Sequence, residues 1–155
     1  MKRGLLFLIA ALAISFAANA QGINDTRHAI GVRGGWGAEI SYQGYVAPEN
    51  RIEGTVGVNR YGFSVEGMYQ WMNDIASDAP GEFKWYPGVG AGLGVWSNDD
   101  FKTGFSAGIL GQIGIEYSFA KAPLMLSLDY RPGFYLVPEF SFDWSGLALG
   151  IRYCF

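Results

Sequence analysis

Gly104-Phe105-Ser106-Ala107-Gly108 has the G-x-S-x-G spacing of a serine-hydrolase nucleophile. In that motif the serine occupies a strained turn between a strand and a helix, and a histidine takes up its proton. This segment instead continues an alternating strand pattern, and the chain's one histidine, His28, is far away in the sequence. The pattern therefore argues against a serine nucleophile, and we expect no enzyme activity.

Glycine recurs at every second position from Gly88 to Gly94. A dinucleotide-binding loop needs G-x-G-x-x-G between a strand and a helix, whereas this spacing is typical of one face of a strand. Glycines there leave room for bulky neighbours such as Tyr86. The single histidine and the single cysteine, Cys154, are too few for a zinc site, and the carboxylates lack calcium-ligand spacing. We expect no cofactor and no metal ion, with Cys154 as a small filler.

Charged residues occupy the polar positions of several alternating segments. Alternation with a period of two indicates β-strands with two different faces. Charges on the inner face of a barrel must pair, because an unpaired buried charge is costly. The sequence predicts a network of charges in the lumen formed by Arg33, Glu39, Glu53, Glu66, Glu82, Lys84, Glu116, Asp129, Arg131 and Arg152.

Eight segments carry this period of two: residues 30–33, 38–43, 52–59, 63–71, 82–95, 105–117, 124–131 and 146–155. Polar or Pro/Gly-rich connections separate them at 34–37, 47–50, 59–62, 73–81, 97–100, 120–123 and 138–143. The prediction is an all-β fold, an antiparallel β-barrel of about eight strands. If Gly34–Gly37 continued a strand instead of forming a tight hairpin, the count would be seven.

The first twenty residues have the pattern of a secretory signal peptide. Lys2 and Arg3 precede an apolar run, and Ala18-Asn19-Ala20 supplies an A-x-A cleavage site. The run is shorter than the ~20 residues that a membrane-spanning helix needs. We expect two parts, a signal peptide at 1–20 and a barrel at 21–155.

Composition limits the environment of the mature chain. Half of the 155 residues are hydrophobic and 16% are charged, against ~25% charged residues in soluble domains. Without residues 1–20 the chain keeps nine Lys and Arg against 14 Asp and Glu, a net charge of −5. This balance leaves no basic patch for a phosphate backbone, so we expect no nucleic-acid partner.

The apolar face is better suited to lipid than to water. Its partner face combines glycines with isolated charges, which makes a poor water-exposed surface. The apolar face also ends in aromatic residues, as at a membrane interface. We expect an aromatic girdle formed by Tyr69, Trp71, Phe83, Trp85, Tyr117 and Phe119. The predicted barrel is therefore transmembrane.

The signal peptide, the alternation and the ending Gly150-Ile151-Arg152-Tyr153-Cys154-Phe155 together resemble those of small outer-membrane β-barrel proteins, the OmpA-transmembrane and OmpX type and their porin-like variants. The resemblance implies a bacterial outer-membrane location, a monomer, and outer-membrane lipids as partners. It also implies that Tyr153 and Phe155 form a signal read by the outer-membrane assembly machinery. A structural or envelope-interaction role is the expected function.

Two alternatives stay open at this point. Inward glycines leave space for a narrow water or ion path, and some outer-membrane lipid hydrolases are barrels of this size. With both termini in the periplasm, the external connections at 34–37, 59–62, 97–102 and 136–143 are short, which weakens an adhesin role. The longest connection, 73–81, would then be periplasmic, where turns are normally short.

Overall fold

Strands are the only regular secondary structure in the residues that the computed structural model describes, which are 27–59, 62–97 and 103–155. Residues 1–20, predicted as a signal peptide, lie outside this part. No helix long and apolar enough to cross a membrane occurs in the described ranges. The strands found there are β1 (His28–Gly34), β2 (Ala38–Ala47), β3 (Asn50–Asn59), β4 (Gly62–Trp71), β5 (Asn73–Ile75), β6 (Glu82–Ser97), β7 (Thr103–Ser118), β8 (Leu124–Tyr130), β9 (Gly133–Val137), β10 (Ser141–Asp143) and β11 (Leu147–Cys154).

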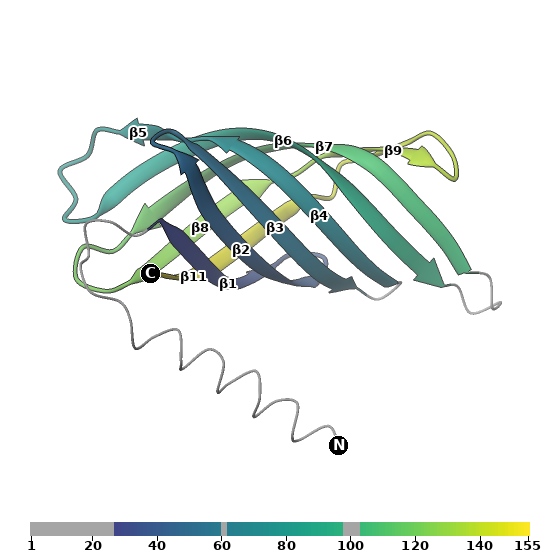
Figure 1. The fold of residues 1–155 in the computed structure, drawn as a ribbon, viewed down its shortest axis with the longest axis horizontal. Coiled ribbons are helices and arrows are strands. Elements are labelled where there is room, and N and C mark those ends of the chain that lie inside the picture. The colour runs from purple at the N-terminus through teal and green to yellow at the C-terminus, as the bar shows by residue number, and fades with distance from the viewer. Residues whose placement is uncertain (1–26, 60–61, 98–102) are drawn as a thin grey trace, which may run out of the picture.

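The strands form one closed antiparallel barrel. Around the barrel the strands pair in the order β1, β2, β3, β4, β6, β7, β8 and β11, with β5 paired to β6, β9 paired to β7 and β10 paired to β9. The barrel closes where β11 pairs with β1, from Ala29 opposite Cys154 to Gly34 opposite Leu149. Figure 1 shows the strands winding obliquely around one lumen. The predicted all-β class and the count of eight barrel strands are confirmed. Eleven strands are labelled because three of the eight barrel strands are each interrupted and carry two labels.

The three divisions explain the eleven strands. Met72 separates β4 from β5, Arg131-Pro132 separates β8 from β9, and 144–146 separate β10 from β11. Pro132 has no backbone N–H and therefore interrupts its ladder. Backbone hydrogen bonds still bridge the gap, since Gly111 N donates to Pro132 O at 2.9 Å and Arg131 N donates to Gly146 O at 2.9 Å.

Two predicted connections are shorter than the sequence indicated. The predicted connection 73–81 begins with β5, which pairs with β6 from Asn73 opposite Trp85 to Ile75 opposite Phe83. The predicted connection 138–143 ends with β10, which pairs with β9. In both places a polar or Pro-rich segment adopts strand geometry because a long neighbouring strand offers backbone partners. The Gly34–Gly37 hairpin is confirmed, with β1 ending at Gly34 and β2 beginning at Ala38.

The barrel has two distinct ends. One end, here called the terminal end, contains the start of β1 and the finish of β11. The connections at this end are 48–49, 76–81 and 119–123. At the opposite end lie the turns 35–37 and 138–140, and there β6, β7 and the β9–β10 hairpin extend furthest (Figure 1). Both chain ends of the described barrel therefore lie on one side, as an even number of antiparallel strands requires.

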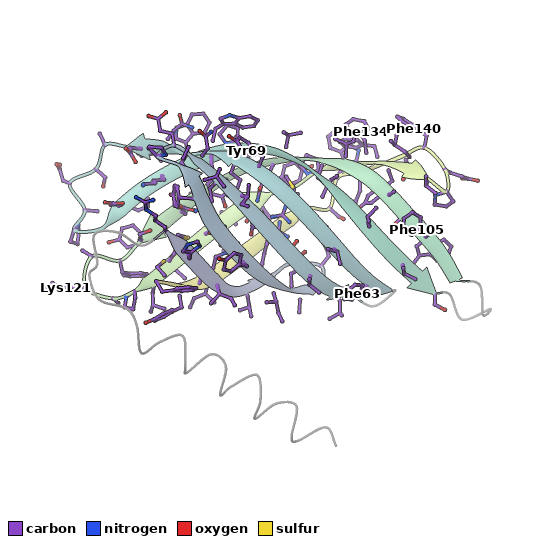
Figure 2. All side chains as sticks on the ribbon, viewed as in Figure 1. Phe63, Tyr69, Phe105, Lys121, Phe134 and Phe140 are labelled. Atoms are coloured by element: carbon purple, nitrogen blue, oxygen red, sulfur yellow. The ribbon has the colours of Figure 1, made fainter. Side chains whose placement is uncertain are left out.

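The two faces of the wall are inverted relative to a water-soluble barrel. Among the described residues, the buried side chains include Arg33, Arg51, Glu53, Gln70, Glu116, Asp129 and Arg152. The outward positions carry exposed aliphatic and aromatic side chains, such as Val32, Ile40, Val56 and Leu128 (Figure 2). The fold thus buries charge and exposes hydrocarbon.

Glycine makes room for a buried aromatic side chain of the lumen wall at one point. Tyr86 on β6 is fully buried and lies across Gly114 of β7, the residue directly opposite it in the ladder. A Cβ at Gly114 would lie 2.6 Å from Cζ of Tyr86 and 2.7 Å from Cβ of Asp129. The ring occupies the space that any larger residue at 114 would need. The inward glycines 88–94 instead lie beside Met68, Gln70, Leu110 and Gln112.

Candidate functional site

Arg33 pairs with carboxylates of two other strands, β2 and β8. The β1–β2 hairpin sets Arg33 directly opposite Glu39, and its Nη1 donates to Glu39 Oε2 at 2.9 Å. Its Nε donates to Asp129 Oδ1 on β8 at 3.0 Å. Gly150 on β11 is the residue opposite Arg33. Because it has no side chain, the Arg33 side chain can extend across the β1–β11 seam, where the first and last strands pair, to Asp129 on β8.

Arg131 reaches carboxylates on two strands, β3 and β4. Its Nη1 donates to Glu66 Oε2 on β4 at 2.6 Å, and its Nη2 donates to Glu53 Oε2 on β3 at 3.1 Å. Glu53 also accepts from Arg152 Nη2 at 2.8 Å and from Ser41 Oγ at 2.6 Å. A carboxylate buried to 2% exposure is thereby held between two guanidinium groups, which is the condition for keeping a charge out of water.

Arg51 is a central member of the network that the sequence analysis missed. Its Nη2 donates to Glu116 Oε2 at 2.8 Å, and its Nε donates to Gln70 Oε1 at 2.7 Å. Gln70 Nε2 in turn donates to Gln112 Oε1 at 2.8 Å and to Glu53 Oε2 at 2.6 Å. Arg51 has the same parity as Glu53 on β3, so counting back by two would have found it. Its position beside a predicted turn concealed this.

Aromatic rings pack against the same guanidinium. The Cζ of Arg51 lies 5.1 Å from the ring centre of Tyr86 and 5.7 Å from that of Tyr45. Rings at this distance attract a cation through their quadrupole. Arg51, Tyr86, Gln70, Gln112 and Glu116 therefore fill the middle of the lumen, and we call these five residues the central plug.

Lys84 and Glu82 lie apart from the plug, at the terminal end. Lys84 Nζ is 3.6 Å from Glu82 Oε2 and 3.6 Å from Asp74 Oδ1. The two carboxylate side chains are 75% and 87% exposed. All ten charged residues named from the sequence form ion pairs, and nine of them are buried or half-buried, whereas Glu82 is exposed at the rim.

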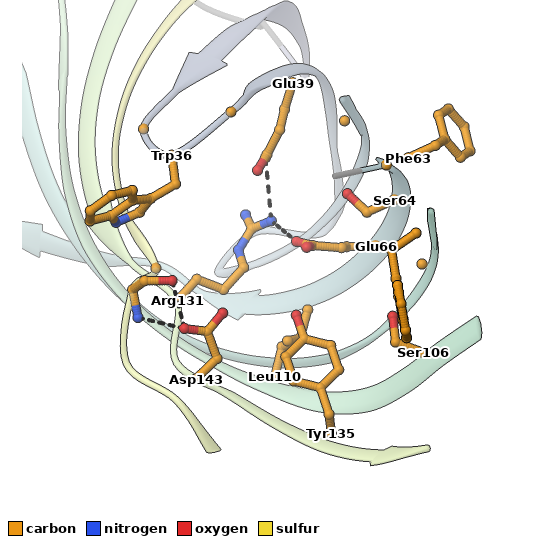
Figure 3. Close-up of a pocket in the computed structure, with 18 of the residues that line it drawn as sticks. Trp36, Glu39, Phe63, Ser64, Glu66, Ser106, Leu110, Arg131, Tyr135 and Asp143 are labelled. Carbon is orange, nitrogen blue, oxygen red and sulfur yellow. Dashed lines mark hydrogen bonds and ion pairs between the residues drawn. The ribbon is translucent and has the colours of Figure 1, made fainter. Parts of the chain in front are cut away.

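Two cavities flank the filled middle of the barrel. The one at the opposite end, here named the Arg131 cavity, has a volume of about 380 Å³ and is lined by Arg131, Glu39, Glu66, Ser106 and Tyr135 among others (Figure 3). The one at the terminal end measures about 860 Å³ and is lined by Gln43, Tyr45, Lys84 and Cys154 among others. The two linings share no residue.

Ser106 and His28, the candidate nucleophile and base, lie at different ends. Ser106 lines the Arg131 cavity. His28 begins β1 at the terminal end, where Tyr42 Oη and His28 Nδ1 are 2.9 Å apart. Cys154 is buried beside Ala29 and Met125. In the described ranges no three His, Cys, Asp or Glu side chains are grouped to hold a metal ion.

The residues named as an aromatic girdle lie on the outer face near the terminal end, and several contact one another. Ring centres are 5.2 Å apart for Tyr69 and Trp71, 4.6 Å for Phe83 and Tyr117, and 4.9 Å for Tyr117 and Phe119. Trp85 is 39% exposed on the same face.

The C-terminal residues close the seam at this same end. His28 N donates to Phe155 O at 3.1 Å, and Phe155 N donates to His28 O at 2.8 Å. The Tyr153 and Phe155 rings stack with centres 6.4 Å apart.

A second aromatic group, not named from the sequence, lies at the opposite end on the β9–β10 hairpin. Phe134, Phe142 and Trp144 form a continuous series with ring centres 4.3 and 4.1 Å apart. Trp144 is 73% exposed and Phe140 is 74% exposed. Both ends of the outer face therefore carry aromatic side chains (Figure 2).

Comparison with known proteins found no matching family model, no matching curated protein and no matching solved structure.

Proposed function

We propose that this chain is an integral β-barrel of a bacterial outer membrane, with a structural or envelope-interaction role and no enzymatic activity. The observation that carries the proposal is the inversion of the two faces, with charge inside and hydrocarbon outside. Water would solvate the outer face poorly, since soluble monomers rarely expose contiguous apolar patches above a few hundred Å². A bilayer would solvate it well, and closure leaves few strand edges with unpaired backbone groups.

The positions of the aromatic residues support the same environment. Transmembrane barrels carry an apolar band about 25 Å tall between two aromatic girdles. Here aliphatic residues such as Val56, Val65 and Leu128 occupy the middle of the outer face, with aromatic groups towards both ends. With the termini in the periplasm, the β9–β10 hairpin would face outward from the cell, and Tyr153 and Phe155 would be the signal for assembly.

Tryptophan quenching tests the membrane location. Variants that keep only Trp85 or only Trp96, the other tryptophans replaced by Phe, are refolded into vesicles of phospholipid brominated on its acyl chains. Trp85 is on the outer face and should be strongly quenched. Trp96 lines the Arg131 cavity and should be quenched much less. Equal fluorescence of both variants in brominated and ordinary lipid would contradict the proposal.

A further inference from the structure

The Arg131 cavity contains more hydrogen-bonding capacity than the protein uses. The hydroxyls of Ser64, Ser106 and Tyr135 line it, and no side-chain hydrogen bond joins them to another described residue. Glu66 uses Oε2 to accept from Arg131, while its Oε1 has no such partner and the side chain is 15% exposed. These groups face a space that a small molecule can enter.

Arg131 itself is incompletely paired. The residue is 5% exposed, and its Nε has no hydrogen-bond partner in the described structure although both terminal nitrogens are bonded. A buried N–H without an acceptor costs about 1–3 kcal/mol. A ligand oxygen entering beside the guanidinium would supply that acceptor.

Aromatic rings line the same cavity. Trp36 on the β1–β2 turn and Trp96 on β6 contribute to its lining together with Tyr135. In Figure 3 Trp36 and Tyr135 lie on either side of the Arg131 side chain, and the Tyr135 hydroxyl points toward the Arg131–Glu66 pair. Pockets for small ligands combine such apolar walls with a few polar groups, and they measure about 300–1,000 Å³.

The mixture of free groups selects the ligand class. Carboxylate oxygens only accept hydrogen bonds and the Arg131 Nε only donates one, so the ligand must offer both donors and acceptors. Arg33 pairs with Glu39 and Arg131 pairs with Glu66, so these charges already have partners within the protein, and Glu139 and Asp143 add two further carboxylates to the lining, which hydroxyl donors can satisfy. A sugar hydroxyl both donates and accepts, and the C–H face of a pyranose ring packs on aromatic rings. We propose that the Arg131 cavity binds a saccharide of one or two rings.

The test uses protein refolded in lauryldimethylamine oxide, whose head group is not a sugar. Trp71, Trp85 and Trp144 are replaced by Phe, so that only Trp36 and Trp96 report. Glucose, galactose and N-acetylglucosamine are titrated to roughly 100 mM, which covers the weak affinities expected of small ligands. At least one sugar should change the fluorescence saturably. Tyr135→Phe and Ser106→Ala should each weaken that binding about three- to tenfold.

The control variant is Tyr117→Phe, because Tyr117 is on the outer face at the other end of the barrel. It should leave sugar binding unchanged. Competition by octyl glucoside below its critical micelle concentration distinguishes a glycolipid head group, which displaces glucose, from a site that takes only the free sugar.

Several results would overturn the inference. They are a folded barrel that binds none of the sugars, binding that Tyr135→Phe and Ser106→Ala leave intact, or saturation by spermidine or Mg²⁺ in place of every sugar. The inference needs only the closed barrel and not its membrane location. Normal Trp85 quenching in lipid without sugar binding would reject the saccharide site and leave the proposed membrane role standing.

Discussion

Individual buried charges in this lumen are stabilising only as pairs. Arg51 and Glu116 are each 1% exposed in their side chains, and Arg51 is the only ion-pair partner of Glu116 among the described residues. Arg51→Met should lower the free energy of unfolding by about 3–5 kcal/mol, because it leaves a buried carboxylate uncompensated. Urea titration of the refolded barrel in micelles measures this change.

The double variant Arg51→Met with Glu116→Leu completes a double-mutant cycle, which separates the loss of the pair from the cost of an unpaired charge. Replacing a whole buried pair by apolar residues is often close to neutral, so the double variant should recover most of the lost stability. Lys84→Met is the matched surface control, since its 3.6 Å ion pairs are with largely exposed carboxylates, and it should cost no more than about 1 kcal/mol. Equal losses at Lys84 and Arg51 would show that water enters the plug freely.

At the scale of the strand, the space between facing residues determines which glycines can be replaced by alanine without loss of stability. Gly114→Ala should destabilise the barrel by roughly 1–3 kcal/mol, because the added methyl group overlaps Tyr86 and Asp129. Gly67→Ala is the control, since a Cβ at Gly67 meets nothing within 4 Å, and it should be neutral or slightly stabilising. Urea midpoints of both variants decide the point, and a Gly114→Ala protein as stable as the wild type would show that the Tyr86 ring is free to move.

Strand alternation was the part of the fold that could be predicted from the residues. Alternation alone assigned Glu53, Glu116 and Asp129 to the inner face. Successive side chains point to opposite faces of a strand, so identifying the apolar positions as the outer face places all the others inside. Parity says nothing about distance across a lumen. That Arg131 reaches Glu53 and Glu66 on the facing wall depends on closure and tilt. Those properties belong to all the strands together.

The ends of strands were the least predictable elements. Polar residues and proline at 73–81 and 138–143 have the composition of connections, yet β5 and β10 form there because β6 and β9 present unpaired backbone groups beside them. The same bias toward turns at 47–50 hid Arg51, which follows the turn at once. Tertiary pairing overrides local composition at these places.

On the scale of the whole molecule, the filled middle of the barrel decides whether solutes can cross it. An eight-stranded barrel is just wide enough for its own side chains to fill the interior. Here Tyr86 and Gln70 are fully buried, and Gln112 is 5% exposed. The cavities towards the two ends share no lining residue, and both observations favour a closed lumen.

Refolded wild-type protein should therefore give no single-channel events in a planar bilayer. Ion passage would require the Arg51–Glu116 pair and the Gln70–Gln112 hydrogen bond to open together, and breaking the pair would leave the buried Glu116 carboxylate without its ion-pair partner. Insertion is verified separately by Trp85 quenching in brominated lipid, so that silence cannot be confused with failed insertion. Steady conductance steps from inserted protein would instead establish a narrow ion path and show that the plug moves as a unit.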